Sequence, residues 1–213
     1  MFADYGNEIS VVSDNGAYVE FRGEFIFAAD IPKKIVIDVT KICKNFADIS
    51  LFLFDVKSAY VQRDLLKSEV LNFMQKYVPR LKVVDSFGEV DDQFLKFAVF
   101  VPNEKLADCY KFLRENLRGK LKAVTSGFNT IDLILQDCNK ASGIKKIIER
   151  KKISPAECAA FGDGENDIEM LKFCGQSYAM ANATQNVKIS AKNICPSNED
   201  DGVLITLEKI FEL

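Results

Sequence analysis

The chain has 213 residues, of which 48% are hydrophobic and 28% charged, and its formal net charge is −3. This composition is ordinary for a globular protein with a sizeable core, and the length allows one large domain or two small ones. The small negative charge offers no basic field to nucleic acid or to an anionic membrane. No apolar run approaches the length of a membrane span, and the opening residues MFADYG lack the pattern of a secretory signal.

The sequence contains no histidine, which excludes Ser-His-Asp catalysis, Cys-His catalysis and His-ligated metals within this chain. Its six cysteines are scattered, and no two form a Cys-x-x-Cys pair. We therefore expect reduced thiols, a cytoplasmic location, and neither a zinc site nor a disulfide framework. Any chemistry has to use carboxylates, lysines, hydroxyls, thiols and backbone amides.

In chain order, residues 8–27 alternate between apolar runs and turns, which predicts a small β meander with its first turn at Asp14-Asn15-Gly16. Residues 30–135 mix amphipathic helical patterns with short strands, with Pro79 ending one helix and Gly127 separating two strands. This mixture indicates an α+β layer with one sheet face covered. After residue 136, helices and strands alternate, as is typical of a parallel sheet with helices on its faces.

The stretch from Ala159 to Leu171, AAFGDGENDIEML, combines a short apolar run, a glycine-rich turn and the start of a helix. In open α/β sheets, ligands bind at the carboxyl ends of strands, where such turns lie. Asp163, Asn166 and Asp167 lie in this turn with a further carboxylate, so a hard cation such as Mg²⁺ is a suitable partner. The alternative is an ordinary turn in which Asn166 or Asp167 caps the helix.

Lys140 precedes this strand, at the expected start of a helix. A lysine there can reach an anion bound at the carboxyl end of the sheet. The alternative is a solvated surface lysine, which is the better interpretation for most lysines of this chain.

Five motifs and one long insertion follow one another along the chain. They are Asn15-Gly16-Ala17, a long α/β insertion, Lys140-Ala141-Ser142-Gly143, GDGENDIEM, AMANA and Asn198-Glu199-Asp200-Asp201-Gly202-Val203. Together they resemble the haloacid dehalogenase (HAD) superfamily, and more narrowly the Cof-type phosphatases, over the whole sequence. The resemblance implies an α/β fold: a Rossmann-type core, residues 1–21 and 136–213, with an inserted α+β cap, residues 22–135, that closes over the substrate.

The resemblance also implies roles for four residues. Lys140 matches the phosphate-binding lysine, Asp163 the Mg²⁺-coordinating aspartate, and Asn166 the amide that contacts the phosphoryl group. Asp167 matches the second acidic residue of the metal site. The implied catalytic residues are Lys140, Asp163 and Asp167, the substrate ligands Lys140 and Asn166, and the metal ligands Asp163 and Asp167. We expect backbone N–H groups of the 162–167 turn to lie near the bound anion.

The implied activity is the Mg²⁺-dependent hydrolysis of a small phosphorylated metabolite, with sugar phosphates, nucleotides and pyridoxal phosphate all open. In the family, the first aspartate of an Asp-x-Asp motif attacks phosphorus, and the second protonates the leaving group. No aspartate of this chain has another aspartate two residues later. Asp14 is a poor substitute, because its neighbours match a different motif. Two hypotheses follow: a phosphatase that is active only when a missing segment is supplied, or a non-catalytic phosphate-binding or structural remnant.

On this interpretation the core is N-terminally incomplete and lacks its first two strands. Buried strand edges then carry unpaired N–H and C=O groups, each costing about 1–3 kcal/mol if left dry. Three solutions are open: the strands at Ile9–Val12 and Ala159–Phe161 close up on one another, another chain fills the gap, or the sequence is part of a longer protein. Because exposed edges recruit other strands, we expect self-association through the core unless its sheet has closed.

Overall fold

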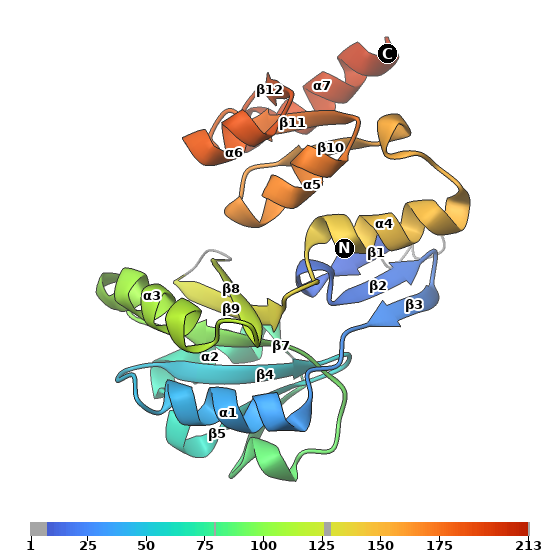
Figure 1. The fold of residues 1–213 in the computed structure, drawn as a ribbon. Coiled ribbons are helices and arrows are strands. Elements are labelled where there is room, and N and C mark those ends of the chain that lie inside the picture. Colours follow the sequence, from blue (N-terminus) through green and yellow to red (C-terminus); the bar gives the residue numbers. More distant parts are fainter. Residues whose placement is uncertain (1–7, 79, 126–128, 213) are drawn as a thin grey trace. The chain divides into compact units, whose positions relative to one another are not determined.

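The computed structural model describes residues 8–78, 80–125 and 129–212 (Figure 1). The opening residues MFADYG, Pro79 and Gly127, to which some of the expectations above refer, lie outside these ranges. The chain divides into two compact units, unit 1 from Met1–Ile26 and Asn139–Leu213 and unit 2 from Phe27–Cys138. Among the described residues, no helix is long and apolar enough to cross a membrane.

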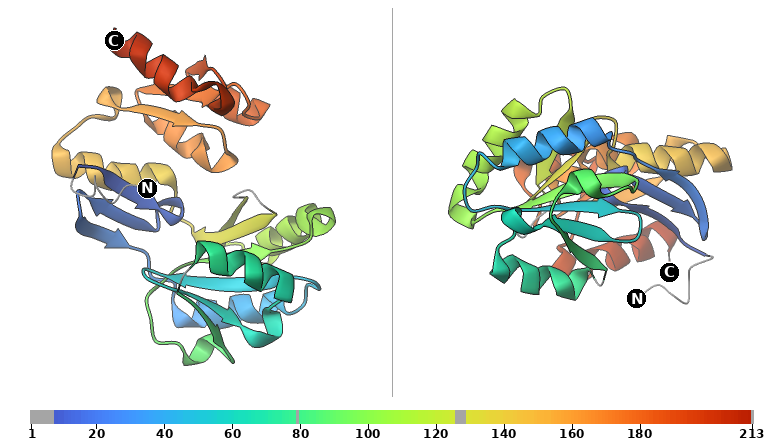
Figure 2. Two further views of the ribbon diagram at one scale, coloured as in Figure 1. Left: turned by 180° about the vertical axis from the view of Figure 1, so that it is seen from behind. Right: turned by 90° about the horizontal axis from the view of Figure 1, so that it is seen from below.

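Unit 2 is built on one mixed sheet, visible from two further directions in Figure 2. Its described residues contribute six strands in the order β6-β5-β4-β7-β9-β8. Neighbouring strands pair antiparallel except β5 and β6, which are parallel. The strands are β4 (Ser50–Asp55), β5 (Ala59–Gln62), β6 (Leu81–Val84), β7 (Phe94–Phe100), β8 (Leu121–Thr125) and β9 (Thr130–Leu135).

Helices cover both faces of this sheet. Helices α1 (Lys33–Cys43) and α3 (Leu106–Asn116) share one core with Leu51 and Leu53, whereas α2 (Ser68–Tyr77) packs with Phe52. The expectation of a single covered face is therefore wrong. The physical reason lies in β4, whose successive residues Leu51, Phe52 and Leu53 are all apolar. Successive side chains of a strand point to opposite faces of the sheet, so both faces need cover from water.

Unit 1 contains two separate sheets within its described residues. Strands β1 (Ser10–Ser13), β2 (Tyr18–Phe21) and β3 (Glu24–Ala28) form a meander, and β1 pairs antiparallel with β2 across the Asp14–Gly16 turn. Strands β10 (Ala159–Gly162), β11 (Gln176–Met180) and β12 (Asn193–Cys195) form a parallel sheet. Both the predicted meander and the predicted parallel sheet are confirmed.

Four helices of the described part of unit 1 accompany these sheets. Helix α4 (Lys140–Lys151) packs on β1, β2 and α5 (Ile168–Phe173), while α5 and α6 (Gln185–Ser190) form a small core with β10 and β11. Helix α7 (Gly202–Phe211) contacts β12. The start of α4 and the turn after β10 both belong to unit 1.

Strands β1 and β10 are each the edge of their own sheet, and the described residues show no pairing between them. The idea that these two strands close up on one another is therefore wrong. Side chains, not backbone groups, connect the two sheets: the Asn166 amide donates to the Asn15 side chain over 2.9 Å. The turn after β1 and the turn after β10 therefore meet through their side chains, while the two strands belong to different sheets.

Candidate functional site

The acid turn, residues 162–167, directly follows the carboxyl end of β10. Gly162 ends the strand, and a Cβ at this position would lie only 2.6 Å from the Cβ of Asp167. Glycine at this position therefore leaves room for the Asp167 side chain to fold back against the end of β10. Asp167 is only 5% exposed there. Glu165–Asp167 then makes a single 3-10 turn that leads into α5.

Both carboxylate oxygens of Asp167 are engaged. Oδ2 accepts hydrogen bonds from the backbone N–H groups of Asp163, at 3.0 Å, and Gly164, at 2.9 Å, and Oδ1 forms an ion pair with Lys140 Nζ. A buried carboxylate needs such partners to offset the loss of water. These two N–H groups consequently face Asp167, and the nearness of the turn's backbone N–H groups to a bound anion stays a prediction.

Lys140 is the first residue of α4, as its sequence context predicted. The preceding Asn139 caps the helix: its side chain accepts from Ser142 N at 2.8 Å, and Ser142 Oγ accepts from Asn139 N at 3.1 Å. A cation in the first helical turn is disfavoured by the helix dipole, and the Asp167 carboxylate offsets this. Lys140 is thus directed toward the acid turn and is not a freely solvated surface lysine.

The turn of the β1–β2 hairpin also meets this site. Asn15 is 9% exposed, has left-handed backbone angles, and accepts the hydrogen bond from Asn166. Its neighbour Gly16 has φ +85°, and a Cβ there would lie 2.0 Å from the carbonyl oxygen of Asn139. The hairpin turn therefore packs directly on the backbone that precedes Lys140.

Polar groups at the carboxyl ends of three parallel strands are linked in a row. Asp163, after β10, accepts through Oδ2 from the Asn182 side chain after β11 at 3.2 Å. Asn182 Oδ1 accepts in turn from Asn198 N at 3.2 Å and Ser197 Oγ at 3.3 Å, after β12. This is the edge at which such sheets bind ligands. Asp163 is exposed, and its Oδ1 accepts no hydrogen bond from any residue that the structure describes.

The structure thus brings Lys140, Asp163 and Asp167 together and adds Asn166 through its contact with Asn15. Two further residues, Asn15 and Asn182, contact this group of side chains, although their residue type alone did not select them. Asn15 and Asn182 both lie in motifs that carried the resemblance. Asn15 lies in the turn between β1 and β2, and Asn182 follows the end of β11 by two residues. A third polar contact, from Thr184 Oγ1 to Glu165 at 2.9 Å, ties the start of α6 to the acid turn.

The donor set can be compared with the needs of Mg²⁺. In residues 8–78, 80–125 and 129–212, no group of three His, Cys, Asp or Glu side chains is arranged to hold a metal ion. Mg²⁺ is commonly held by one or two carboxylates, with water and substrate phosphate completing its shell. Asp163, exposed and with one oxygen unengaged, fits that role. Asp167 could coordinate directly only by giving up Lys140 or the two backbone N–H groups.

The chain thus combines a parallel α/β sheet, a Lys-Asp-Asn cluster at its carboxyl edge, and a second α/β unit inserted between the two segments of the first. The family model of haloacid dehalogenase-like hydrolases matches residues 1–207. The chain belongs to this family.

Two relatives illustrate the similarity in sequence. The chain is 31% identical over 214 residues to 5-amino-6-(5-phospho-D-ribitylamino)uracil phosphatase YbjI of Escherichia coli (strain K12), covering 99% of this chain and 78% of the relative. It is 40% identical to the putative phosphatase BU028/BU029 of Buchnera aphidicola, covering 95% and 75% respectively. The relatives are thus longer than this chain.

Solved structures share the fold. SMU.1108c from Streptococcus mutans superposes with a TM-score of 0.89 at 28% identity, covering 100% of this chain and 80% of that one. The HAD subclass IIB sugar phosphatase BT4131 superposes with a TM-score of 0.79 at 23% identity, covering 95% and 75%. The expected α/β class with a HAD-like, Rossmann-type core is confirmed.

Proposed function

We propose that the protein binds the phosphoryl group of a small phosphorylated metabolite at the acid turn, as part of a HAD-type phosphatase. The observation that carries this proposal is the Lys140–Asp167 ion pair beside the exposed Asp163 carboxylate, at the carboxyl edge of a parallel sheet. Relatives support the substrate class: one acts on 5-amino-6-(5-phospho-D-ribitylamino)uracil, and a 25% identical relative from Serratia proteamaculans is an HMP-PP phosphatase.

In this proposal each residue has a distinct task. Lys140 neutralises charge on the phosphoryl oxygens, and Asn166, held by Asn15, contacts them through its side-chain amide. Asp163 holds Mg²⁺, which when bound would neutralise further phosphoryl charge as a Lewis acid. Asp167 keeps Lys140 and the turn in position through its three contacts, and supports the metal site indirectly.

We propose that unit 2, which contains most of the 22–135 segment, is the cap that selects the substrate. It has its own sheet and its own core, which is what an inserted specificity domain requires.

The six cysteines all lie in the described part of the chain, and none forms a disulfide, in keeping with the cytoplasmic setting we propose.

The nucleophile decides between the two hypotheses. A strand laid parallel along the unpaired edge of β10 would end at the same sheet edge as Asp163, because parallel strands share their carboxyl ends. A segment that supplies an aspartate there would complete a phosphatase. Without such a segment, residues 1–213 bind phosphate but form no aspartyl-phosphate, which is the non-catalytic alternative.

Equilibrium binding of orthovanadate, a phosphate analogue, to the chain in the presence of Mg²⁺ tests the proposed site. We expect saturable binding that weakens at least about tenfold in Lys140→Met and in Asp163→Asn, since each removes a charge-assisted contact. Lys145→Met is the matched control, because Lys145 lies on the same helix and is exposed. Equal affinity in all three variants would contradict the proposal.

A further inference from the structure

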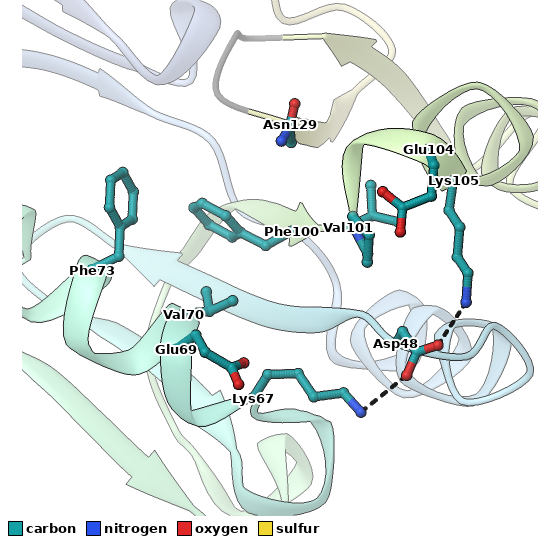
Figure 3. A pocket seen from close by; sticks show the side chains of 11 residues that line it. Asp48, Lys67, Glu69, Val70, Phe73, Phe100, Val101, Glu104, Lys105 and Asn129 are labelled. Carbon is teal, nitrogen blue, oxygen red and sulfur yellow. Dashed lines mark hydrogen bonds and ion pairs between the residues drawn. The ribbon is translucent and has the colours of Figure 1, made fainter.

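A pocket of about 740 Å³ lies within unit 2, between α2 and the end of β7 (Figure 3). Its volume lies in the range of small-molecule sites. The pocket has an apolar wall made of four side chains. Two of them, Val70 and Phe73, belong to α2, and the other two are Phe100 at the end of β7 and Val101 directly after it. None of these four residues belongs to the phosphate site proposed above.

The aromatic part of this wall is held in place by ring contacts. Phe100 packs edge-on against Phe52 of the sheet, with ring centroids 5.4 Å apart and an interplanar angle of 75°. Phe73 meets Phe100 at 6.1 Å and 66°, and remains 37% exposed. A rigid, partly exposed aromatic surface of this kind favours a flat ring as its partner.

The cationic groups of the pocket are already paired. Asp48 contacts Lys67 Nζ at 3.3 Å and Lys105 Nζ at 2.6 Å, using one carboxylate oxygen for each (Figure 3). The two lysines lower the pKa of the Asp48 carboxyl, chiefly through the hydrogen bond from Lys105. Both ammonium groups are shared with Asp48, so an anionic ligand has to compete with this carboxylate for them.

The two other carboxylates of the pocket are not paired in this way. Glu69 and Glu104 line it from α2 and from the turn after β7, and both are exposed. In the part of the chain that the structure describes, neither makes a hydrogen bond or an ion pair. The side-chain amide of Asn129, which can donate or accept, also lines the pocket. The polar groups open to a ligand are therefore mainly acceptors.

We propose that this pocket binds a flat, neutral or cationic heteroaromatic ring that carries amino groups, such as an aminopyrimidine. The ring stacks on the exposed Phe73 and meets Phe100 edge-on, and its N–H groups donate to Glu69 and Glu104. Two carboxylates repel an anionic ring by the same Coulomb term that attracts a cationic one. All residues of this site belong to unit 2, and none of them belongs to the phosphate site proposed at the acid turn.

The test is a calorimetric titration of the whole chain with 2,4-diaminopyrimidine, and with orotate, a pyrimidine that carries a carboxylate. We expect saturable binding of the base and none of orotate. The double variant Glu69→Gln/Glu104→Gln should bind the base at least about tenfold more weakly, because it loses two charge-assisted hydrogen bonds. Glu115→Gln, an exposed position on α3 outside the pocket, serves as the matched control and should bind as the parent chain does.

Three results would overturn the proposal. They are the absence of saturable binding of the base, an affinity that is the same in the double variant and the Glu115→Gln control, and orotate binding as tight as that of the base. Since the two glutamates are exposed, the double variant should keep its fold, and circular dichroism of both variants checks this. Orthovanadate binding to the double variant should be unchanged, which separates failure at this pocket from failure at the acid turn.

Discussion

Lys140 at the start of α4 forms an ion pair with Asp167, and the second oxygen of the same carboxylate accepts the backbone N–H groups of Asp163 and Gly164. The two charged residues are 27 positions apart in the chain. One buried carboxylate therefore fixes both the conformation of the acid turn and the direction of the lysine. The proposed ligands of metal and phosphate depend on this single residue for their arrangement.

The first prediction concerns this carboxylate. Asp167→Asn keeps the size of the side chain and removes its charge. We expect the free energy of unfolding to fall by about 1–3 kcal/mol, because Lys140 loses its partner and two N–H groups face a weaker acceptor. The Lys140 side chain is 32% exposed, so water compensates for part of the loss. Urea denaturation measures the change, and the exposed Glu208→Gln should shift stability by less than about 0.5 kcal/mol.

The second prediction separates steric contact from backbone strain at two glycines. Gly16 and Gly119 have φ of +85° and +79°, so alanine costs about 1–2 kcal/mol of strain at either position. At Gly16 the new Cβ would also meet the Asn139 carbonyl oxygen at 2.0 Å, whereas at Gly119 no described atom lies within 4 Å. We expect Gly16→Ala to destabilise by at least about 2 kcal/mol more than Gly119→Ala in urea denaturation. Equal losses would contradict the close packing of the hairpin turn on the start of α4.

The third prediction concerns thiol reactivity. Burial raises the pKa of Cys43 to about 12 and that of Cys109 to about 11, while Cys158 is only half-buried. The thiolate is the reactive form, so iodoacetamide at pH 8 should modify Cys158 first and the two buried thiols only after unfolding. Peptide mass spectrometry identifies the sites, and Cys158→Ser should remove the fast phase. Early labelling of Cys43 would show that its surroundings open readily.

The same two thiols imply a pH dependence of stability. Their pKa values in the folded chain lie above the unfolded value near 8.5. The stability that they contribute is therefore present below about pH 8.5 and is lost as the pH rises toward 11–12, where deprotonation favours the unfolded chain. Urea denaturation at pH 8 and pH 10 should show the loss, and Cys43→Ala should reduce it.

The fourth prediction concerns turnover. We expect no Mg²⁺-dependent hydrolysis of p-nitrophenyl phosphate or of sugar phosphates by residues 1–213, because no Asp-x-Asp pair is present to form and release an aspartyl-phosphate. A colorimetric phosphate assay of the purified chain measures this. Turnover that disappears in Asp163→Ala would contradict the prediction and would require another nucleophile in this chain.

Local patterns predicted those parts of the site that depend on near neighbours. Asn139 and Ser142, three residues apart, cap the start of α4. The Gly162 turn directly follows an apolar run, so the positions of Lys140 and Asp163 could be expected from the sequence. These features follow from local hydrogen bonding and from the absence of a side chain at Gly162, which a sequence displays directly.

Long-range contacts could not be predicted in this way. The Asn166–Asn15 hydrogen bond joins residues 151 positions apart, and no local preference indicates it. The engagement of both oxygens of Asp167 depends on the side chain folding back over Gly162, which a count of acidic residues does not reveal. Cover on both faces of the unit 2 sheet depends on helices that are distant from β4 in the sequence, and the residues of β4 alone do not identify them.

The last prediction concerns the edge of β10. In the described residues this strand pairs only with β11, and its Phe161 ring stacks on Tyr178 with centroids 4.9 Å apart. Leu204 on α7 of the same unit is 57% exposed. Because an open strand edge recruits further strands, we expect the chain to self-associate through unit 1. Light scattering over a dilution series measures this. Ala159→Lys, at an exposed position of the edge, should weaken association, whereas Ile37→Lys on α1 should not, and a monomer at every concentration would contradict the prediction.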